Sequence, residues 1–255
     1  MNRVISKSGN RVIENTSREQ VTRFPDSPIL RFVNAVWTVT RKDLLVEART
    51  REILYTTIFF AVSCVLVFAF GFVREGRPVL DAAAGILWIA ISFSGTLALG
   101  RAFERERHGE TLRALLIAPV DRPALYLGKL AGILILLAAV EALVVPLVAL
   151  MFQAALFSHA TLMVGLLAAG TIGFAAVGTL FAAMLVRARS RDVMLPVLLY
   201  PITVPVIIAG VRGTAALLQP EADLSMARAW LAMLVFFDVV FVTLALWTFE
   251  PVMTE

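Results

Sequence analysis

Six long apolar runs constrain this chain more than any other feature of its sequence. They fall at about residues 53–73, 82–102, 124–152, 162–186, 194–211 and 230–249. A bilayer core is crossed by about 20 mostly apolar residues in a helix, since backbone groups in lipid must bond within the segment. Apolar residues make up 59% of the sequence, whereas soluble domains are about 45–50% apolar. The sequence therefore predicts an all-α polytopic membrane protein with six transmembrane helices.

The fifth run is interrupted by Pro196, Pro201 and Pro205. Proline is tolerated in membrane helices when neighbouring groups satisfy the freed carbonyls, so we expect a kinked span here. The segment that follows, 212–229, begins with apolar residues. We expect its first half to dip back into the membrane surface.

Basic residues are distributed unequally between the two sides that the spans define. With the N-terminus in the cytoplasm, nineteen of the 23 Lys and Arg residues fall in inside segments. The positive-inside rule then places both termini in the cytoplasm. The same asymmetry explains the net charge of +4 without a nucleic-acid ligand. The single cysteine, Cys64, lies in an apolar run, which excludes a disulfide framework.

The chain before the first span divides into two parts. Residues 1–28 form a polar lead-in, to which we assign no function. Residues 29–52 are amphipathic, with apolar residues at helical spacing at Val33, Trp37, Leu44 and Ala48. This pattern predicts a helix lying in the cytoplasmic interface; a soluble helical tail without membrane contact is the alternative. The transmembrane domain then covers 53–255.

A charged segment between the second and third spans has the pattern of an ordered helix. "ERERHGE" is followed by "TLRALLIA", which places Leu112, Leu115 and Leu116 on one stripe. Pro119 ends the pattern because it lacks an N–H and clashes with the preceding turn. We therefore expect an amphipathic cytoplasmic helix over 104–118. Such a helix suits docking into a groove on a soluble partner, and a helix lying on lipid is the alternative.

The next helix is predicted to start directly after this break. Asp121 has the residue type of an N-cap, and Pro123 is suited to the first turn. We expect Lys129, about two turns later, to extend back to the lipid headgroups.

The sequence lacks a phosphate-binding loop. "YLGK" at 126–129 ends in Gly-Lys, but Pro123 stands where the motif requires glycine and Leu130 where it requires Ser or Thr. No nucleophile–base pair stands out either, so we do not expect the chain to be an enzyme. If transport is driven by ATP, a separate ATPase subunit must bind the nucleotide.

Polar residues within the spans are candidate functional groups. Glu141 and Asp238 would be costly in lipid and must face protein or water, or be protonated. A contact at a dimer interface or on a substrate route and a plain hydrogen bond to a neighbouring helix are both open. Ala169 and Gly173 predict close packing of the fourth span.

His159, in the third-to-fourth connection, has a side chain that could ligate a metal-containing group. A solvated loop histidine is the more ordinary interpretation. The other histidine, His108, is expected on the opposite side of the membrane, so the two are not expected to ligate one metal centre. The sequence shows no Cys/His metal-ligand spacing.

Three passages of the sequence resemble the CcmB family, the permease subunit of the ABC-type system of cytochrome c maturation. They are residues 41–70, 85–132 and 185–210, in the expected order. The resemblance implies six spans, an interfacial helix before them and a cytoplasmic coupling helix on 104–118. The residues that would engage the ATPase are Glu104, Glu106, Gly109, Glu110, Leu112, Leu115, Leu116 and Pro119.

The resemblance also implies a setting. The location would be the bacterial inner membrane, and the partners a CcmA-type ATPase, a second copy of the chain, and CcmC- and CcmD-type subunits. ATP would bind the ATPase, haem would be the cargo with His159 as a candidate ligand, and no cofactor is assigned to this chain. The output would be haem export or release of a haem-loaded periplasmic chaperone. An ABC-2-type permease for a drug, glycan or lipid, and a non-transporting membrane scaffold, are the alternatives.

Overall fold

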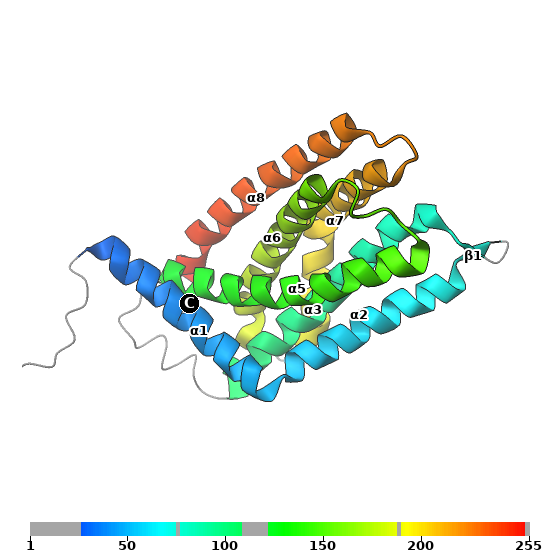
Figure 1. The fold of residues 1–255 in the computed structure, drawn as a ribbon. Helices are drawn as coiled ribbons and strands as arrows, with labels where there is room; N and C mark the ends of the chain where they lie inside the picture. Colours follow the sequence, from blue (N-terminus) through cyan, green and yellow to red (C-terminus); the bar gives the residue numbers. More distant parts are fainter. Residues whose placement is uncertain (1–26, 75–76, 109–121, 188–189, 253–255) are drawn as a thin grey trace, which may run out of the picture.

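The computed structural model describes residues 27–74, 77–108, 122–187 and 190–252, and these are almost entirely helical (Figure 1). Its α-helices are α1 (Pro28–Thr50), α2 (Glu52–Gly71), α3 (Ala83–His108), α5 (Arg122–Phe152), α6 (Ala160–Met184), α7 (Arg191–Leu218) and α8 (Leu224–Val252). Short elements are β1 (Val73–Arg74), β2 (Arg77–Pro78), η1 (Leu80–Ala82) and η2 (Leu185–Arg187). Six of the helices, all but α1, are long and apolar enough to span a membrane. The predicted all-α class with six spans is confirmed.

The spans divide into central and peripheral helices. In their apolar windows α3 is 67% buried and α6 61% buried, whereas α8 is only 11% buried. Small residues bring α6 close to its neighbours: a Cβ added at Gly173 would lie 2.5 Å from Oδ1 of Asp238 on α8. Ala169 is also buried. The predicted close packing of this span is confirmed, since backbones approach where side chains are small.

Trp88 of α3 holds three helices together. Its side chain is 1% exposed, and its indole Nε1 donates a hydrogen bond of 3.0 Å to Oγ1 of Thr214 on α7. The ring lies against two glycines: an added Cβ would come within 2.1 Å of it at Gly170 and 2.4 Å at Gly210. Only glycine fits at either position without movement of the ring. The ring of Trp88 therefore acts as a wedge that fixes α3 against α6 and α7.

The helix α7 is longer than the predicted fifth span. It runs through its three prolines to Leu218, and Thr214 and Ala216 in its last turns are buried. The expectation that the first half of 212–229 dips back into the membrane surface is therefore wrong. Its apolar residues belong to α7 because they pack against the other spans, with Thr214 bonded to Trp88.

The connection between α7 and α8 ends at a capping residue. The Oδ1 of Asp223 accepts hydrogen bonds from the N–H of Met226 at 2.9 Å and from Oγ of Ser225 at 2.6 Å. These bonds stabilise the carboxylate and hold the pKa of Asp223 below its ordinary value. They start α8 directly after a short loop.

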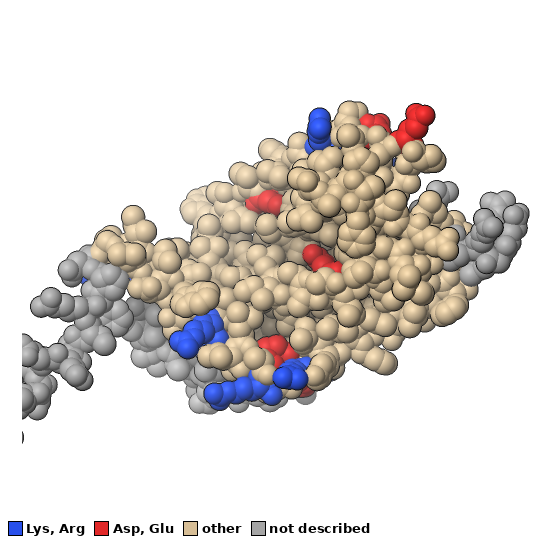
Figure 2. Space-filling view, viewed as in Figure 1, with Lys and Arg blue, Asp and Glu red and all other residues tan. Residues whose placement is uncertain are grey.

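The helix α1 turns sharply into α2 (Figure 1) and packs along α5. The contact is close because Gly128 faces it: a Cβ there would lie 2.7 Å from the Cβ of Val39. Another side of α1 leaves Ile29, Val33 and Trp37 exposed. Figure 2 shows Lys and Arg gathered over the α1–α2 corner, with a surface beyond that carries few charged residues. The predicted helix is present, and its place in the membrane interface stays a prediction.

Candidate functional site

The predicted ATPase-coupling segment lies only partly within the described residues. The helix α3 continues past the span to His108, so the backbone of Glu104 and Glu106 belongs to its last turns. The other coupling residues lie outside the residues that the structure describes: Gly109, Glu110, Leu112, Leu115, Leu116 and Pro119. The helix α5 begins at Arg122, after the predicted break. The coupling role of this segment stays a prediction.

The two helix ends that border this segment are held firmly. Phe103 of α3 is 3% exposed, and the Nζ of Lys129 on α5 lies 5.8 Å from the centre of its ring. This distance is within the range of a cation–π contact. On its other side α3 reaches α2, where Nη1 of Arg101 lies 3.6 Å from Oε1 of Glu52. A force applied to the end of α3 would therefore reach α5 and α2 through direct contacts.

Lys129 does not extend to the membrane surface as expected. Its side chain is 7% exposed, and its Nζ lies 2.7 Å from Oδ2 of Asp43 on α1. The other oxygen of Asp43 lies 3.1 Å from Nζ of Lys42. The expectation failed because α1 brings a carboxylate to the lysine, and a buried charge is tolerated when paired. No local sequence signal marks this pair, since its partners come from distant helices.

The corner between α1 and α2 is built by two charged residues. Oε1 of Glu47 accepts a hydrogen bond of 2.8 Å from the backbone N–H of Leu54, in the first turn of α2. A carboxylate there is favoured by the positive end of the helix. Arg51 between the helices has φ of 54°, the left-handed region that favours glycine. Its own N–H donates to the carbonyl of Glu47 at 2.6 Å, which closes the corner.

The guanidinium of Arg51 is bonded only to neutral oxygens among the described residues. Nη1 donates to the hydroxyl of Tyr55 at 3.3 Å, and Nε donates to the carbonyl of Ala48 at 3.4 Å. The hydroxyl favours the charged form and raises the pKa of Arg51 above its ordinary value. Arg51 thus stays cationic at the point where the first span begins.

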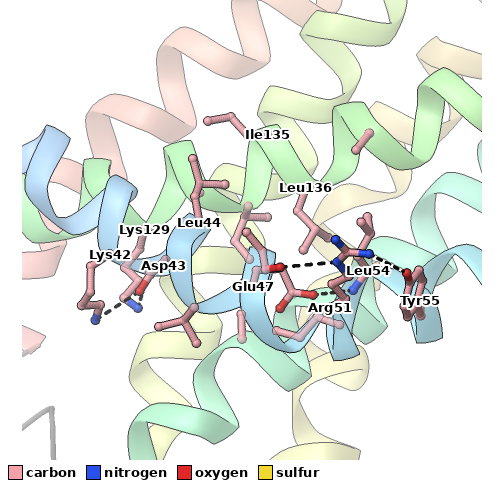
Figure 3. Close-up of a pocket in the computed structure, with 17 residues that line it drawn as sticks. Lys42, Asp43, Leu44, Glu47, Arg51, Leu54, Tyr55, Lys129, Ile135 and Leu136 are labelled. Carbon is pink, nitrogen blue, oxygen red and sulfur yellow. Dashed lines mark hydrogen bonds and ion pairs between the residues drawn. The ribbon is translucent and has the colours of Figure 1, made fainter.

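A pocket of about 580 Å³ lies beneath this corner (Figure 3). Figure 3 shows Lys42, Asp43 and Lys129 at one end and Arg51 with Tyr55 at the other. Its walls are mostly apolar side chains of α1, α2 and α5: Leu44, Val46, Ala48, Ile53, Leu54, Ile133, Ile135, Leu136 and Ala139. The volume lies within the usual 300–1,000 Å³ range of small-molecule sites. The pocket is thus an apolar chamber with a charged rim.

The two intramembrane carboxylates lie on different sides of α6. The hydroxyl of Thr171 donates a hydrogen bond to Oε1 of Glu141 on α5. Asp238 of α8 lies against Gly173, and its Oδ1 is buried with no hydrogen-bond partner among the described residues. Thr171 and Gly173 are two positions apart, which places them on roughly opposite sides of a helix. The carboxylates therefore form no joint site, and their functional roles stay predictions.

His159 stands directly before α6, at the opposite end of the bundle from His108. Its Nδ1 lies 3.3 Å from Oγ of Ser158, and both are exposed to some degree. Within residues 27–74, 77–108, 122–187 and 190–252, no three His, Cys, Asp or Glu residues are placed to hold a metal ion. Its role as a haem ligand stays a prediction.

Comparison with known proteins gives a consistent picture. The family model described as CcmB protein matches residues 34–253, which include every span and the segment between α3 and α5. Heme exporter protein B of Rhodobacter capsulatus is 31% identical over 171 residues, which cover 66% of this chain and 78% of that protein. Heme exporter protein B of Escherichia coli is 28% identical over 93 residues, 36% of this chain and 42% of that protein. With six spans in one bundle and a family match over most of its length, the chain is a multi-pass membrane protein that belongs to the CcmB family.

Proposed function

We propose that this chain is the permease subunit of an ABC-type haem-export complex that serves cytochrome c maturation. The observation that carries the proposal is the family match, which runs without interruption from α1 to the end of α8. Both relatives compared above are named heme exporter protein B. The complex would reside in the bacterial inner membrane, with both termini of this chain in the cytoplasm. The excess of basic residues in the inside segments supports this orientation.

ATP hydrolysis takes place on a separate subunit in this proposal. The sequence has no phosphate-binding loop, because Pro123 and Leu130 replace the residues that "YLGK" would require. A CcmA-type ATPase docks on the 104–118 segment, with Leu112, Leu115 and Leu116 as its apolar contacts. Glu104, Glu106 and Glu110 supply charge around them.

The helix α3 transmits the movement of the ATPase into the membrane. It extends beyond the span as one continuous helix to His108. It is also the most buried span, and Trp88 near its other end is wedged between α6 and α7. Displacement of its cytoplasmic end therefore moves packed neighbours rather than lipid. The coupling works through a rigid element whose two ends bind different partners.

The remaining partners follow from the family. Two copies of this chain pair with two ATPase subunits, and CcmC- and CcmD-type subunits complete the assembly. The work of the ATPase drives haem export, or the release of a haem-loaded periplasmic chaperone from the complex. Either output uses the same coupling step.

A single substitution in the docking segment tests the coupling assignment. Leu115→Asp places a charge on the apolar stripe, so we expect loss of ATPase co-purification from detergent extracts. The amount of this chain in the membrane should stay unchanged. Arg113→Gln, off the stripe, is the matched control and should leave co-purification intact. Retention of the ATPase by Leu115→Asp would show that the docking assignment is wrong.

A second measurement separates a permease from a passive scaffold. When the ATPase is mixed with this chain in liposomes, its ATP turnover should be higher with the native chain than with Leu115→Asp. Equal turnover with the native chain, with the variant and with neither would favour a scaffold that does not engage the ATPase.

A further inference from the structure

The pocket below the α1–α2 corner has an amphipathic lining, with its charges at the membrane boundary. Its charged side chains are Lys42, Asp43, Glu47, Arg51 and Lys129. The first span begins at Glu52, so Arg51 stands at its edge. Ile135 and Ala139 lie deeper along α5, inside a span, and both are exposed. The pocket therefore runs from the headgroup region toward the acyl chains of the bilayer.

The electrostatics of this lining favour an anion. Three basic side chains face two acidic ones. The acidic pair is already engaged: Asp43 lies between Lys42 and Lys129, and Glu47 accepts the N–H of Leu54. Arg51 bonds only neutral oxygens among the described residues. A guanidinium so placed is suited to a phosphate group, which it can bind through parallel N–H···O bonds.

The backbone conformation of Arg51 also supports a functional role for its side chain. Its φ of 54° lies in the left-handed region, where a residue with a Cβ is disfavoured and glycine is the common choice at a helix end. The backbone conformation at this position therefore does not explain why the residue is arginine. Its side chain, however, is placed at the mouth of the pocket, beside Tyr55 (Figure 3). Strain held at such a position is associated with a functional side chain.

We propose that this pocket binds one membrane phospholipid with an anionic headgroup. The headgroup phosphate contacts Arg51 and the hydroxyl of Tyr55. One acyl chain follows the apolar wall formed by Ile135, Leu136 and Ala139 of α5. The bound lipid fills the space between α1, α2 and α5. It thereby stabilises the corner next to the end of α3, which leads into the ATPase-coupling segment. This site is separate from that segment, and its test requires no ATPase.

Native mass spectrometry of the full-length protein in detergent tests the charge requirement. The probes are phosphatidylglycerol, which is anionic, and phosphatidylethanolamine, which is zwitterionic. We expect phosphatidylglycerol to bind about fivefold more tightly, and Arg51→Gln to remove this preference. The matched control is Arg212→Gln, which changes an exposed arginine near the C-terminal end of α7, outside the pocket. This variant should preserve the preference for phosphatidylglycerol. Equal binding of the two lipids, or an unchanged preference in Arg51→Gln, would overturn the proposal.

A second pair of variants tests the apolar wall. Ala139 lines the pocket, whereas its neighbour Ala138 is exposed outside the lining. Ala139→Phe should occupy the acyl-chain space and reduce retention of phosphatidylglycerol about fivefold, the loss of roughly one methylene group of contact. Ala138→Phe should leave it unchanged. Equal retention in both variants would contradict the proposed route of the chain.

The variant Arg51→Gly tests whether a loss of lipid preference could be caused by misfolding. Glycine relieves the left-handed backbone, so this variant should fold at least as well as the native chain. It should nevertheless lose the preference for phosphatidylglycerol, and Arg51→Lys should restore part of it. A folded Arg51→Gly protein that keeps the full preference would overturn the assignment of Arg51 as the headgroup contact.

Discussion

Around Trp88 the helices are held together chiefly by shape, whereas the junction of α1, α2 and α5 combines the close contact of Gly128 with Val39 and a buried ion pair beside a cavity. The ring of Trp88 fits against Gly170 and Gly210, and its one polar atom is satisfied by Thr214. At the junction, Lys129 is paired with Asp43 over a pocket of about 580 Å³. The two regions lie toward opposite ends of α3.

This difference indicates where the molecule can change conformation. A closely packed wedge has no second arrangement of similar energy, because even one added methyl group would collide with it. Ion pairs beside a cavity can exchange partners, and the cavity gives the helices room to shift. We therefore expect the charged junction, which contacts the end of α3 through Glu52 and Arg101, to move during the transport cycle while the Trp88 region acts as a fixed point.

The largest effect is expected from breaking the shape-based region. Gly170→Ala places a Cβ 2.1 Å from the ring of Trp88. Overpacking of this kind typically costs 1–3 kcal/mol, and we expect about 3 kcal/mol here, measured by thermal unfolding in detergent. Gly85→Ala on α3 is the matched control, because a Cβ there meets no atom within 4 Å. Equal stability of the two variants would mean that Trp88 is not a tight wedge.

A smaller effect is expected from breaking the charge-based region. Asp43→Asn removes the carboxylate nearest to the buried Lys129. Removing one partner of a fully buried pair costs about 3–5 kcal/mol; because Asp43 is 26% exposed, we expect about 2 kcal/mol.

The control for this substitution is Lys42→Gln, which removes the more exposed partner of the same carboxylate. Exposed pairs contribute about 0–1 kcal/mol, so its effect should be the smaller of the two. The reverse order would contradict the assignment of Asp43–Lys129 as the structural pair.

The contact between Glu141 and Thr171 sharpens the comparison, because it is polar yet lies within the spans. Thr171→Val removes the hydroxyl that donates to the carboxylate and keeps the side-chain shape. Hydrogen bonds between membrane helices average about 0.6 kcal/mol, and we expect a loss of about that size in unfolding experiments. Thr203→Val on α7, whose hydroxyl bonds its own helix, is the control and should cost less. A loss above that from Gly170→Ala would show that polar contacts, not shape, dominate the span interior.

The smallest effect is expected at the cap of α8, outside both regions. Because folding lowers the pKa of Asp223, its contribution to stability is present above the unfolded pKa near 3.8 and is lost as pH falls through the folded pKa. Asp223→Ala should therefore lower the melting temperature slightly at neutral pH, and the two proteins should converge below pH 3.8. A difference that grew in acid would contradict the direction of the pKa shift.

The sequence predicted the local features of this fold and missed its distant pairings. Apolar runs located the spans, and the Asp121–Pro123 pattern placed the start of α5 at the correct point. The bond from Trp88 to Thr214 joins residues 126 positions apart, and no periodicity relates them. The sequence alone predicts that Lys129 extends to the headgroups, because its partner, Asp43, lies on another helix. The pocket was missed for the same reason, since its walls come from α1, α2 and α5.

The segment between α3 and α5 must face the cytoplasm if an ATPase is to bind it. The direct measurement is labelling of Glu110→Cys with a membrane-impermeant thiol reagent, in a Cys64→Ser background. We predict labelling in inverted vesicles and none in intact spheroplasts, with the opposite result for Phe157→Cys on the α5–α6 connection. Labelling of Glu110→Cys from outside intact spheroplasts would place the segment beyond the reach of a cytoplasmic ATPase and contradict the account.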